Sequence, residues 1–268
     1  MQNSSAKVAS SPAFVVWLLA VSGVPMTEPE WLGTADLYAM VDSVYDNITA
    51  RQTRLFACAC CRRVWNFLNE DWMRDAVTTM ERFADGAVSQ DVFETTAGMV
   101  WMKACERREW VCPSSDDPVA YKAFRDRVNA YTAVMLTTRL DPCAVRTTYG
   151  PIEGFWDNRS EVDLEHRAQR DILRDIVGNP FRPVVRDQTL LRCQQNVEIR
   201  DQARRMYDAN RYELKPFGRL LEAAGCTNEQ VLEHCLGDSS HVRGCFAVDL
   251  FLDIPGAEGG PLLTMGCS

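Results

Sequence analysis

Apolar residues recur at helical spacing along most of this chain. The clearest stretch is 53–68, where they stand three or four positions apart, at Ala57, Cys60, Cys61, Val64 and Leu68. That spacing places them on one face of an α-helix. The same periodicity runs through most of 71–139 and 160–252. We therefore predict an all-α protein, an irregular bundle of about eight to ten helices.

Proline and glycine residues interrupt this pattern and divide the chain. The segment 141–158 contains two prolines and two glycines. It is the predicted linker between a helical lobe at 26–140 and a second lobe at 159–254. The last residues, 255–268, are rich in glycine and are predicted to form a flexible tail.

A short proline-containing segment interrupts the second lobe. Its two prolines each fix their own φ angle and bias the preceding residue away from helix. We predict an extended strap over 179–185 that packs across the helices through Phe181, with Asn179 and Arg182 in structural or interaction roles. Binding of a peptide or a partner by this strap is the alternative.

The N-terminal segment has two interpretations. Residues 1–25 contain an apolar run after one positive charge, which is typical of a signal peptide. The run is shorter than the roughly 20 apolar residues of a membrane-spanning helix, so no stable span is expected. Alternatively, residues 1–25 are an upstream extension and the protein begins at Met26, because Thr27 and Glu30 form a capping-box pattern directly after it. We favour the second interpretation.

The charge balance limits the classes of partner. The formal net charge is −8, and 46% of the residues are hydrophobic, which is typical of a globular protein. Nucleic acids and anionic membranes require a basic surface, so neither is an expected partner. The doublet Arg62 and Arg63 is short, and we interpret it as a solvated or salt-bridging helix face, with phosphate binding as the lesser alternative.

Eleven cysteines are many for a chain of 268 residues. Most lie inside apolar helical patterns, where a free cysteine behaves as a small buried hydrophobic residue. Disulfide frameworks belong mainly to short secreted chains. We therefore predict free thiols and a cytoplasmic location, with export as the alternative if residues 1–25 are a signal peptide.

Several phrases of the sequence occur together in a fixed order. They are MTE and WL within 26–32, RLFACACCRR at 54–63, ERFADG at 81–86, LRDIVGNPFRP at 173–183, AAGC at 223–226 and HVRGC at 241–245. Over residues 26–254 the chain resembles a family of uncharacterised bacterial proteins abundant in planctomycetes. Members of that family begin at the position of Met26 and usually have tryptophan where this chain has Phe246. The resemblance supports a start at Met26 and implies no activity.

The stretch 226–245 concentrates the residue types that carry chemistry. It contains two of the three histidines and three of the cysteines. His241 and Cys245 stand four residues apart on a predicted helix at 240–252, so both are expected on one face. Together with Cys226 and His234 they form a candidate zinc site, because thiolate and imidazole are ligands that zinc prefers.

Two other interpretations of this stretch remain open. The cysteines can be packing residues, since this stretch has no CxxC spacing. Cys245 can instead be the nucleophile of a Cys/His-dependent hydrolase. Arg243 and Asp249 have predicted structural roles, because an acid on an apolar helix is usually paired with an arginine. Arg243, Arg182 and Arg174 are the candidate partners of Asp249, and such a buried pair would fix the fit between lobes.

The sequence contains no common enzyme signature, and its function is predicted from composition and pattern alone. We expect a non-catalytic helical module that interacts with another protein, whose aromatic and arginine residues anchor the partner. A zinc-binding protein is the alternative, and a hydrolase is the second alternative.

Overall fold

The structure is a computed structural model that describes residues 26–34, 36–106, 111–114, 116–139, 151–152 and 154–254. The predictions for residues 1–25 and 255–268, and for most of the linker, lie outside the described residues. Within those ranges the chain forms twelve α-helices, one 3-10 helix and no strand, which confirms the all-α prediction. These helices outnumber the predicted eight to ten; one example of the difference is the periodic stretch 188–208, which a break at Asn196 divides into two helices.

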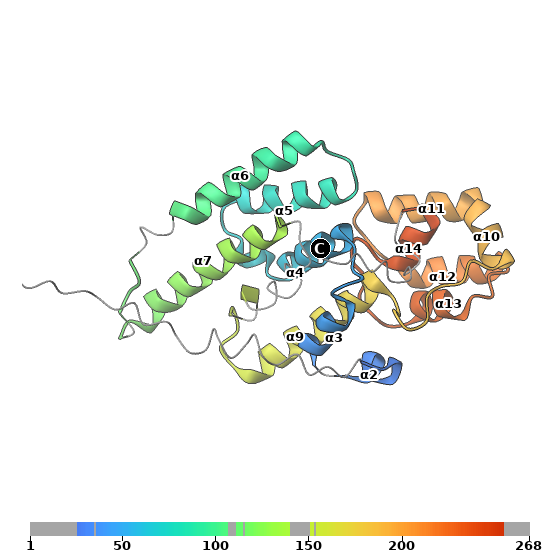
Figure 1. Ribbon diagram of the computed structural model, residues 1–268, viewed down its shortest axis with the longest axis horizontal. Helices are drawn as coiled ribbons and strands as arrows, with labels where there is room; N and C mark the ends of the chain where they lie inside the picture. The colour runs from blue at the N-terminus through green and yellow to red at the C-terminus, as the bar shows by residue number, and fades with distance from the viewer. Residues whose placement is uncertain are drawn as a thin grey trace, which may run out of the picture.

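Figure 1 shows the arrangement of the helices. Those up to residue 177 are α2 (Glu28–Gly33), α3 (Leu37–Val44), α4 (Ala50–Arg63), the 3-10 helix η1 (Trp65–Phe67), α5 (Asp71–Ala84), α6 (Gln90–Glu106), α7 (Pro118–Thr137) and α9 (Arg159–Val177). Those after residue 187 are α10 (Gln188–Gln195), α11 (Val197–Asp208), α12 (Leu214–Ala223), α13 (Glu229–Leu236) and α14 (Phe246–Phe251).

Helix α4 is the centre of a first hydrophobic core, whose buried residues run from Trp31 to Val177. A capping box starts this helix: Thr49 Oγ1 accepts a hydrogen bond from Gln52 N at 3.1 Å, and Thr49 N donates to Gln52 Oε1 at 3.0 Å. The helix packs against α5, α7 and α9, and its cysteines are buried among them. Burial on most sides explains why so much of its sequence is apolar.

The basic doublet at the end of α4 forms two ion pairs. Arg62 binds Glu81 of α5 at 2.6 Å, and Arg63 binds Glu165 of α9 at 2.9 Å. Both glutamates are buried, so each arginine satisfies an acid that would otherwise be costly to bury. The doublet therefore ties α4 to its neighbours.

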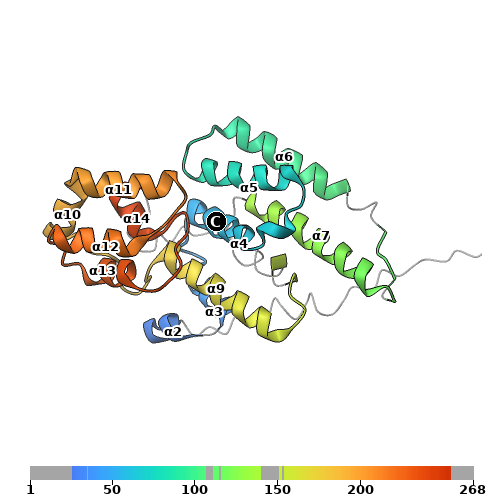
Figure 2. The same ribbon diagram turned by 180° about the vertical axis from the view of Figure 1, so that it is seen from behind.

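Helices α10 to α14 surround a second hydrophobic core, which begins at Val184. They lie together at one end of the molecule in both ribbon views (Figures 1 and 2). Phe217 and Phe251 meet edge to face at its centre, with ring centroids 5.2 Å apart. Among the described residues, the division between the two cores falls between Val177 and Val184, so that α9 packs with the first core.

The strap joins the two cores and crosses α2. Its first residues form a turn rather than the predicted extended chain, because Asn179 Oδ1 accepts a hydrogen bond from Phe181 N at 3.0 Å. Asn179 also donates to Glu28 at 2.7 Å, and Arg182 pairs with Glu28 at 3.0 Å. The Phe181 ring meets Trp31 edge to face, with centroids 6.4 Å apart.

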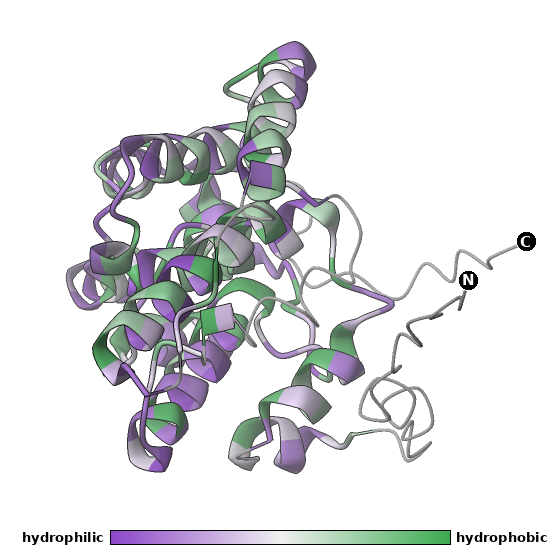
Figure 3. Cartoon of the chain, turned by 90° about the vertical axis from the view of Figure 1, so that its left-hand side faces the viewer, coloured by the Kyte–Doolittle hydropathy of each residue, from purple (hydrophilic) through white to green (hydrophobic). Residues whose placement is uncertain are grey.

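Most helices show hydrophilic and hydrophobic stretches in alternation along their length (Figure 3). This is the pattern of helices with one face in a core and the other in solvent. None of the helices in the described ranges combines the length and apolar character that a bilayer crossing requires.

Candidate metal centre

Four side chains with metal-ligating atoms converge between the two cores. They are Asp175, His234, His241 and Cys245, and one ligand atom of each lies within 4.8 Å of the others. Asp175 comes from the first core, and the other three come from the second. Such a group can hold a metal ion. We call it the ligand group.

Helix α9 carries Asp175 into the space between the cores. Asn158 caps the start of this helix by accepting a hydrogen bond from Glu161 N at 2.9 Å. The helix ends at Gly178, whose φ of 73° favours glycine, and a Cβ atom there would lie 3.3 Å from the Phe246 ring. Because Asp175 lies on the buried face of α9, it is only 1% exposed.

Helix α13 positions His234 in its last turn. Asn228 caps the start of α13 by accepting a hydrogen bond from Val231 N at 3.1 Å. The His234 ring contacts two other rings, with its centroid 4.8 Å from that of His241 and 4.4 Å from that of Phe246. These contacts fix the orientation of the His234 imidazole within the ligand group.

A turn, and not the predicted helix, brings His241 and Cys245 together. The backbone N of Cys245 donates to the Val242 carbonyl at 3.1 Å, and α14 begins only at Phe246. Gly244 has a φ of 91°, which a helix does not allow, and a Cβ atom at this position would lie 2.6 Å from Leu55 of α4. The prediction of a helix from residue 240 was therefore wrong at its start, although the side chains of His241 and Cys245 do lie in the same group.

The contacts within the ligand group share atoms, so the four side chains do not form separate hydrogen-bonded pairs. His234 Nε2 lies 3.0 Å from Asp175 Oδ1 and 3.2 Å from Cys245 Sγ. His241 Nδ1 lies 2.7 Å from the same carboxylate oxygen. Val242 N donates to the other carboxylate oxygen, Oδ2, at 2.8 Å. One oxygen thus faces two imidazoles, and one nitrogen faces both an oxygen and a sulfur.

The pKa values of the two acidic members of the ligand group, Asp175 and Cys245, shift in opposite directions. Burial alone would raise the pKa of Asp175, but hydrogen bonds from His234 and His241 outweigh it and lower the pKa below its usual value. Burial, together with the charge of Asp175, raises the pKa of the Cys245 thiol well above its usual value. The carboxylate is therefore ready to bind a cation, whereas the thiol releases its proton only to a metal or a strong base.

The geometry is not that of a Cys–His–Asp catalytic triad. In a triad the histidine uses one ring nitrogen for the nucleophile and the other for the acid. Here His234 Nε2 contacts both Asp175 and Cys245. The thiol of Cys245 is also completely buried, and its raised pKa opposes the thiolate form that a nucleophile needs.

The structure brings together three of the four residues expected in a zinc site. Cys226 lies elsewhere, beside Cys193 of α10, and Asp175 occupies the remaining position in the ligand group. The sequence does contain a signal for Asp175. It follows Ile172 by three residues and directly precedes Ile176, so an acid falls within the apolar face of a helix.

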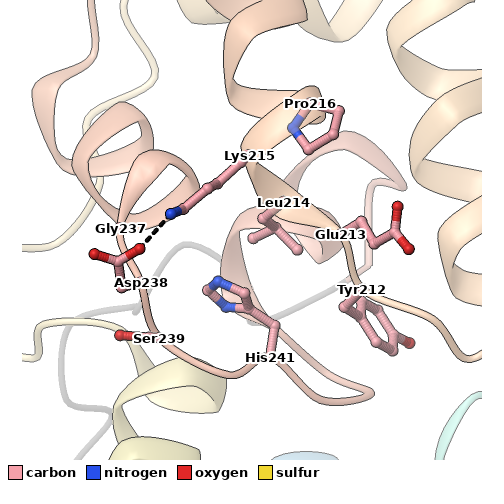
Figure 4. A pocket seen from close by; sticks show the side chains of 9 residues that line it. All are labelled: Tyr212, Glu213, Leu214, Lys215, Pro216, Gly237, Asp238, Ser239 and His241. Atoms are coloured by element: carbon pink, nitrogen blue, oxygen red, sulfur yellow. Dashed lines mark hydrogen bonds and ion pairs between the residues drawn. The ribbon is translucent and has the colours of Figure 1, made fainter.

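The ligand group lies between two surface hollows. His241 lines a pocket of about 340 Å³, and Figure 4 shows its ring in the middle of that pocket, with the ion pair of Lys215 and Asp238 to one side. Asp175 and His234 line a second, larger cleft of about 580 Å³. Ser239 borders both hollows.

A second buried polar cluster also connects the two cores, and we call it the charge network. Its members are Arg51, Asp85, Tyr207, Arg243 and Asp249. Arg51 contacts Asp249 at 2.5 Å and Asp85 at 3.0 Å, and Arg243 contacts Asp85 at 2.6 Å. The arginine bound to Asp249 is therefore Arg51, which lies 198 positions away in the chain, rather than one of the three predicted candidates.

Arg243 and Asp249 have the kind of contacts that fix one core against the other. The Arg243 guanidinium lies 4.3 Å from the centroid of the Tyr207 ring and donates to the Tyr207 carbonyl at 3.3 Å. Burial raises the pKa of Asp249 to about 6, although Arg51 opposes that shift.

Comparison of the chain with protein-family models, with curated proteins and with solved structures finds no match.

Proposed function

We propose that this protein binds one zinc ion through the ligand group and that the ion is structural. The observation that carries the proposal is the convergence of four donor atoms on one place from three segments: α9, α13 and the turn at 241–245. A single imidazole nitrogen carries either one proton or one lone pair, yet His234 Nε2 lies 3.0 Å from Asp175 Oδ1 and 3.2 Å from Cys245 Sγ. A cation at the common centre would satisfy all four atoms at once.

The donor set favours zinc over other metal ions. One thiolate, two imidazoles and one carboxylate are the ligand types of zinc sites, and four ligands complete its tetrahedral shell. Magnesium and calcium prefer oxygen ligands alone, so a site with sulfur and two nitrogens does not suit them. Zinc would also favour the thiolate of Cys245 despite its burial.

Burial of the site supports a structural role. Asp175 and Cys245 are fully buried, and the side chain of His241 is 4% exposed. With four protein ligands, tetrahedral coordination leaves no position for a substrate. The ion would instead fasten α13, the turn at 241–245 and α14 to α9. The protein is then a zinc-stabilised helical module that presents its surface to a partner protein, with no catalytic role of its own.

Metal analysis of the protein purified without added metal tests this proposal. We expect inductively coupled plasma mass spectrometry to find one zinc ion per chain in the wild type and no zinc in His241→Ala. Cys226→Ser is the matched control, because it removes a cysteine of the predicted site that lies outside the ligand group; it should keep one zinc. A folded wild-type protein that is free of metal and takes up no added zinc would overturn the proposal.

A further inference from the structure

The larger cleft lies where the two cores and the strap meet. Its walls come from α2, the end of α9, the strap and the first turns of α13. The apolar part of its lining consists of Trp31, Leu32, Pro183, Val185 and Phe246. At about 580 Å³ it has the size of a site that binds a small molecule or a few residues of a peptide.

The charge of this cleft is strongly negative. Six acids and two arginines line it, together with His234. Both arginines are already neutralised by neighbours: Arg174 contacts Asp171 at 3.1 Å, and Arg182 contacts Glu28 at 3.0 Å. Arg174 also donates to the Trp31 carbonyl, at 2.8 Å. Each guanidinium is thus paired with an acid of the same cleft, so the lining keeps a net negative charge.

Two of the acids are available to a ligand. Glu229 and Glu233 lie one turn apart on α13, line the cleft and are exposed. Within the described residues neither makes an ion pair. Like charges four residues apart on a helix repel each other, and a bound cation would relieve that repulsion.

We propose that this cleft binds a short segment of a partner protein in which a lysine or arginine is flanked by apolar residues. The basic side chain would lie against Glu229 and Glu233. The flanking apolar side chains would cover Leu32 and Val185, which are 59% and 73% exposed at the edge of the cleft. A free cation would leave these two residues uncovered, so the chemistry of the edge favours a peptide.

The inference extends the proposed function and does not depend on zinc. Glu229 and Glu233 are not members of the ligand group, although His234 and Asp175 form part of the floor of the cleft. Substitution of the two glutamates should therefore leave the zinc content unchanged. Failure of peptide binding with one zinc still bound would reject this inference alone, and absence of zinc would reject the proposed function alone.

Fluorescence anisotropy with three labelled peptides tests the inference on the full chain. The peptides are identical leucine-flanked pentapeptides with arginine, glutamine or glutamate at the centre. We expect the arginine peptide to bind about tenfold more tightly than the glutamate peptide, and its affinity to fall with added salt, since the contact is electrostatic. Binding of the arginine peptide should weaken about fivefold to tenfold in the double variant Glu229→Gln/Glu233→Gln.

The matched control is Asp91→Asn/Glu94→Gln, which makes the same change of net charge on α6, on the far side of the molecule (Figure 1). It should bind the arginine peptide as the wild type does. Equal affinity for all three peptides, no binding, or an unchanged affinity in the α13 variant would overturn the inference. Competition by free arginine amide at the same concentration as the peptide would also overturn it, because the cleft would then recognise a small cation.

Discussion

The ligand group and the charge network occupy equivalent positions between the two cores, but they are built differently. In the charge network, cations and anions alternate, and each arginine lies against one or two acids. In the ligand group, all four atoms are of the kind that donate electron pairs to a metal, and they face one common centre. Alternating charges satisfy each other, whereas converging donors require a shared cation or shared protons.

The five residues from His241 to Cys245 supply both clusters. His241, Cys245 and the backbone N of Val242 contribute to the ligand group, and Arg243 contributes to the charge network. Gly244 brings this turn against Leu55 of α4. One short turn therefore sets the position of the second core relative to both α9 and α4. The comparison predicts that the two clusters respond differently to metal removal, substitution and pH.

Removal of metal should have the largest effect, and it should act only through the ligand group. With zinc bound well above its dissociation constant, we expect a chelator to lower the free energy of unfolding by about 5 kcal/mol or more. Urea denaturation with and without the chelator measures this loss. In His241→Ala the chelator should have no further effect. A similar loss in that variant would mean that the stabilising metal lies elsewhere.

Arg51→Ala should have the next largest effect, without change in zinc content. The substitution leaves Asp249 and part of Asp85 without a cation in a buried environment, which costs about 4 kcal/mol. Arg182→Ala is the control: its ion pair with Glu28 is largely exposed, so a loss of at most about 1 kcal/mol is expected. Equal losses in the two variants would show that the charge network adds no stability beyond a surface pair.

The pH dependence of Asp249 tests the charge network in a different way. Because its pKa is raised to about 6 in the folded protein, Asp249 binds a proton in the fold at a pH where the unfolded chain does not. Protonation of Asp249 therefore favours the folded state as the pH falls from 6 towards 4. In metal-free protein, the stability of the wild type relative to Asp249→Asn should rise by about 2 kcal/mol between pH 7 and 4.5.

A fall over that interval would instead mean that the attraction of Arg51 outweighs burial and that the pKa of Asp249 is lowered. The measurement uses urea denaturation at both pH values, with a chelator present throughout. Metal must be absent because protonation of the histidine ligands would release zinc over the same interval. Arg51, Asp85, Tyr207 and Arg243 all face Asp249 or its partners, so the result reports on the whole charge network.

The fold class followed directly from the sequence, because helical periodicity is a local property. The stretch 53–68 shows this: the residues of its predicted apolar face are all buried, although α4 ends at Arg63 and a 3-10 helix follows it. Three members of the ligand group were also predicted, since histidine and cysteine are scarce enough to attract notice. Asp175 was not, because it is one of 37 acids in the chain and only its apolar neighbours distinguish it.

Long-range pairing was the part that the sequence did not reveal. Cys226 is close to His234 in the chain but belongs to a different contact, beside Cys193. Arg51 and Asp249 are 198 positions apart, and no local pattern links them. The turn at 241–245 was predicted as the start of a helix over 240–252, and that helix was the reason for expecting His241 and Cys245 on one face. Gly244, which lies between them, has a positive φ angle that prevents a helix there. This glycine is the subject of the last test.

Gly244→Ala and Gly225→Ala should separate the cost of backbone strain from the cost of lost packing. Both glycines have positive φ angles, 91° and 82°, so alanine at either position costs about 1 kcal/mol through strain. A Cβ atom at 225 meets nothing within 4 Å, whereas one at 244 would lie 2.6 Å from Leu55 Cδ1. Gly244→Ala should therefore be less stable than Gly225→Ala by about a further 1 kcal/mol, because overpacking displaces the turn.

Because the turn at 241–245 supplies both clusters, Gly244→Ala should also bind zinc more weakly than Gly225→Ala. Equal stability and equal zinc affinity would show that the turn shifts freely and that each cluster is held by its own helices.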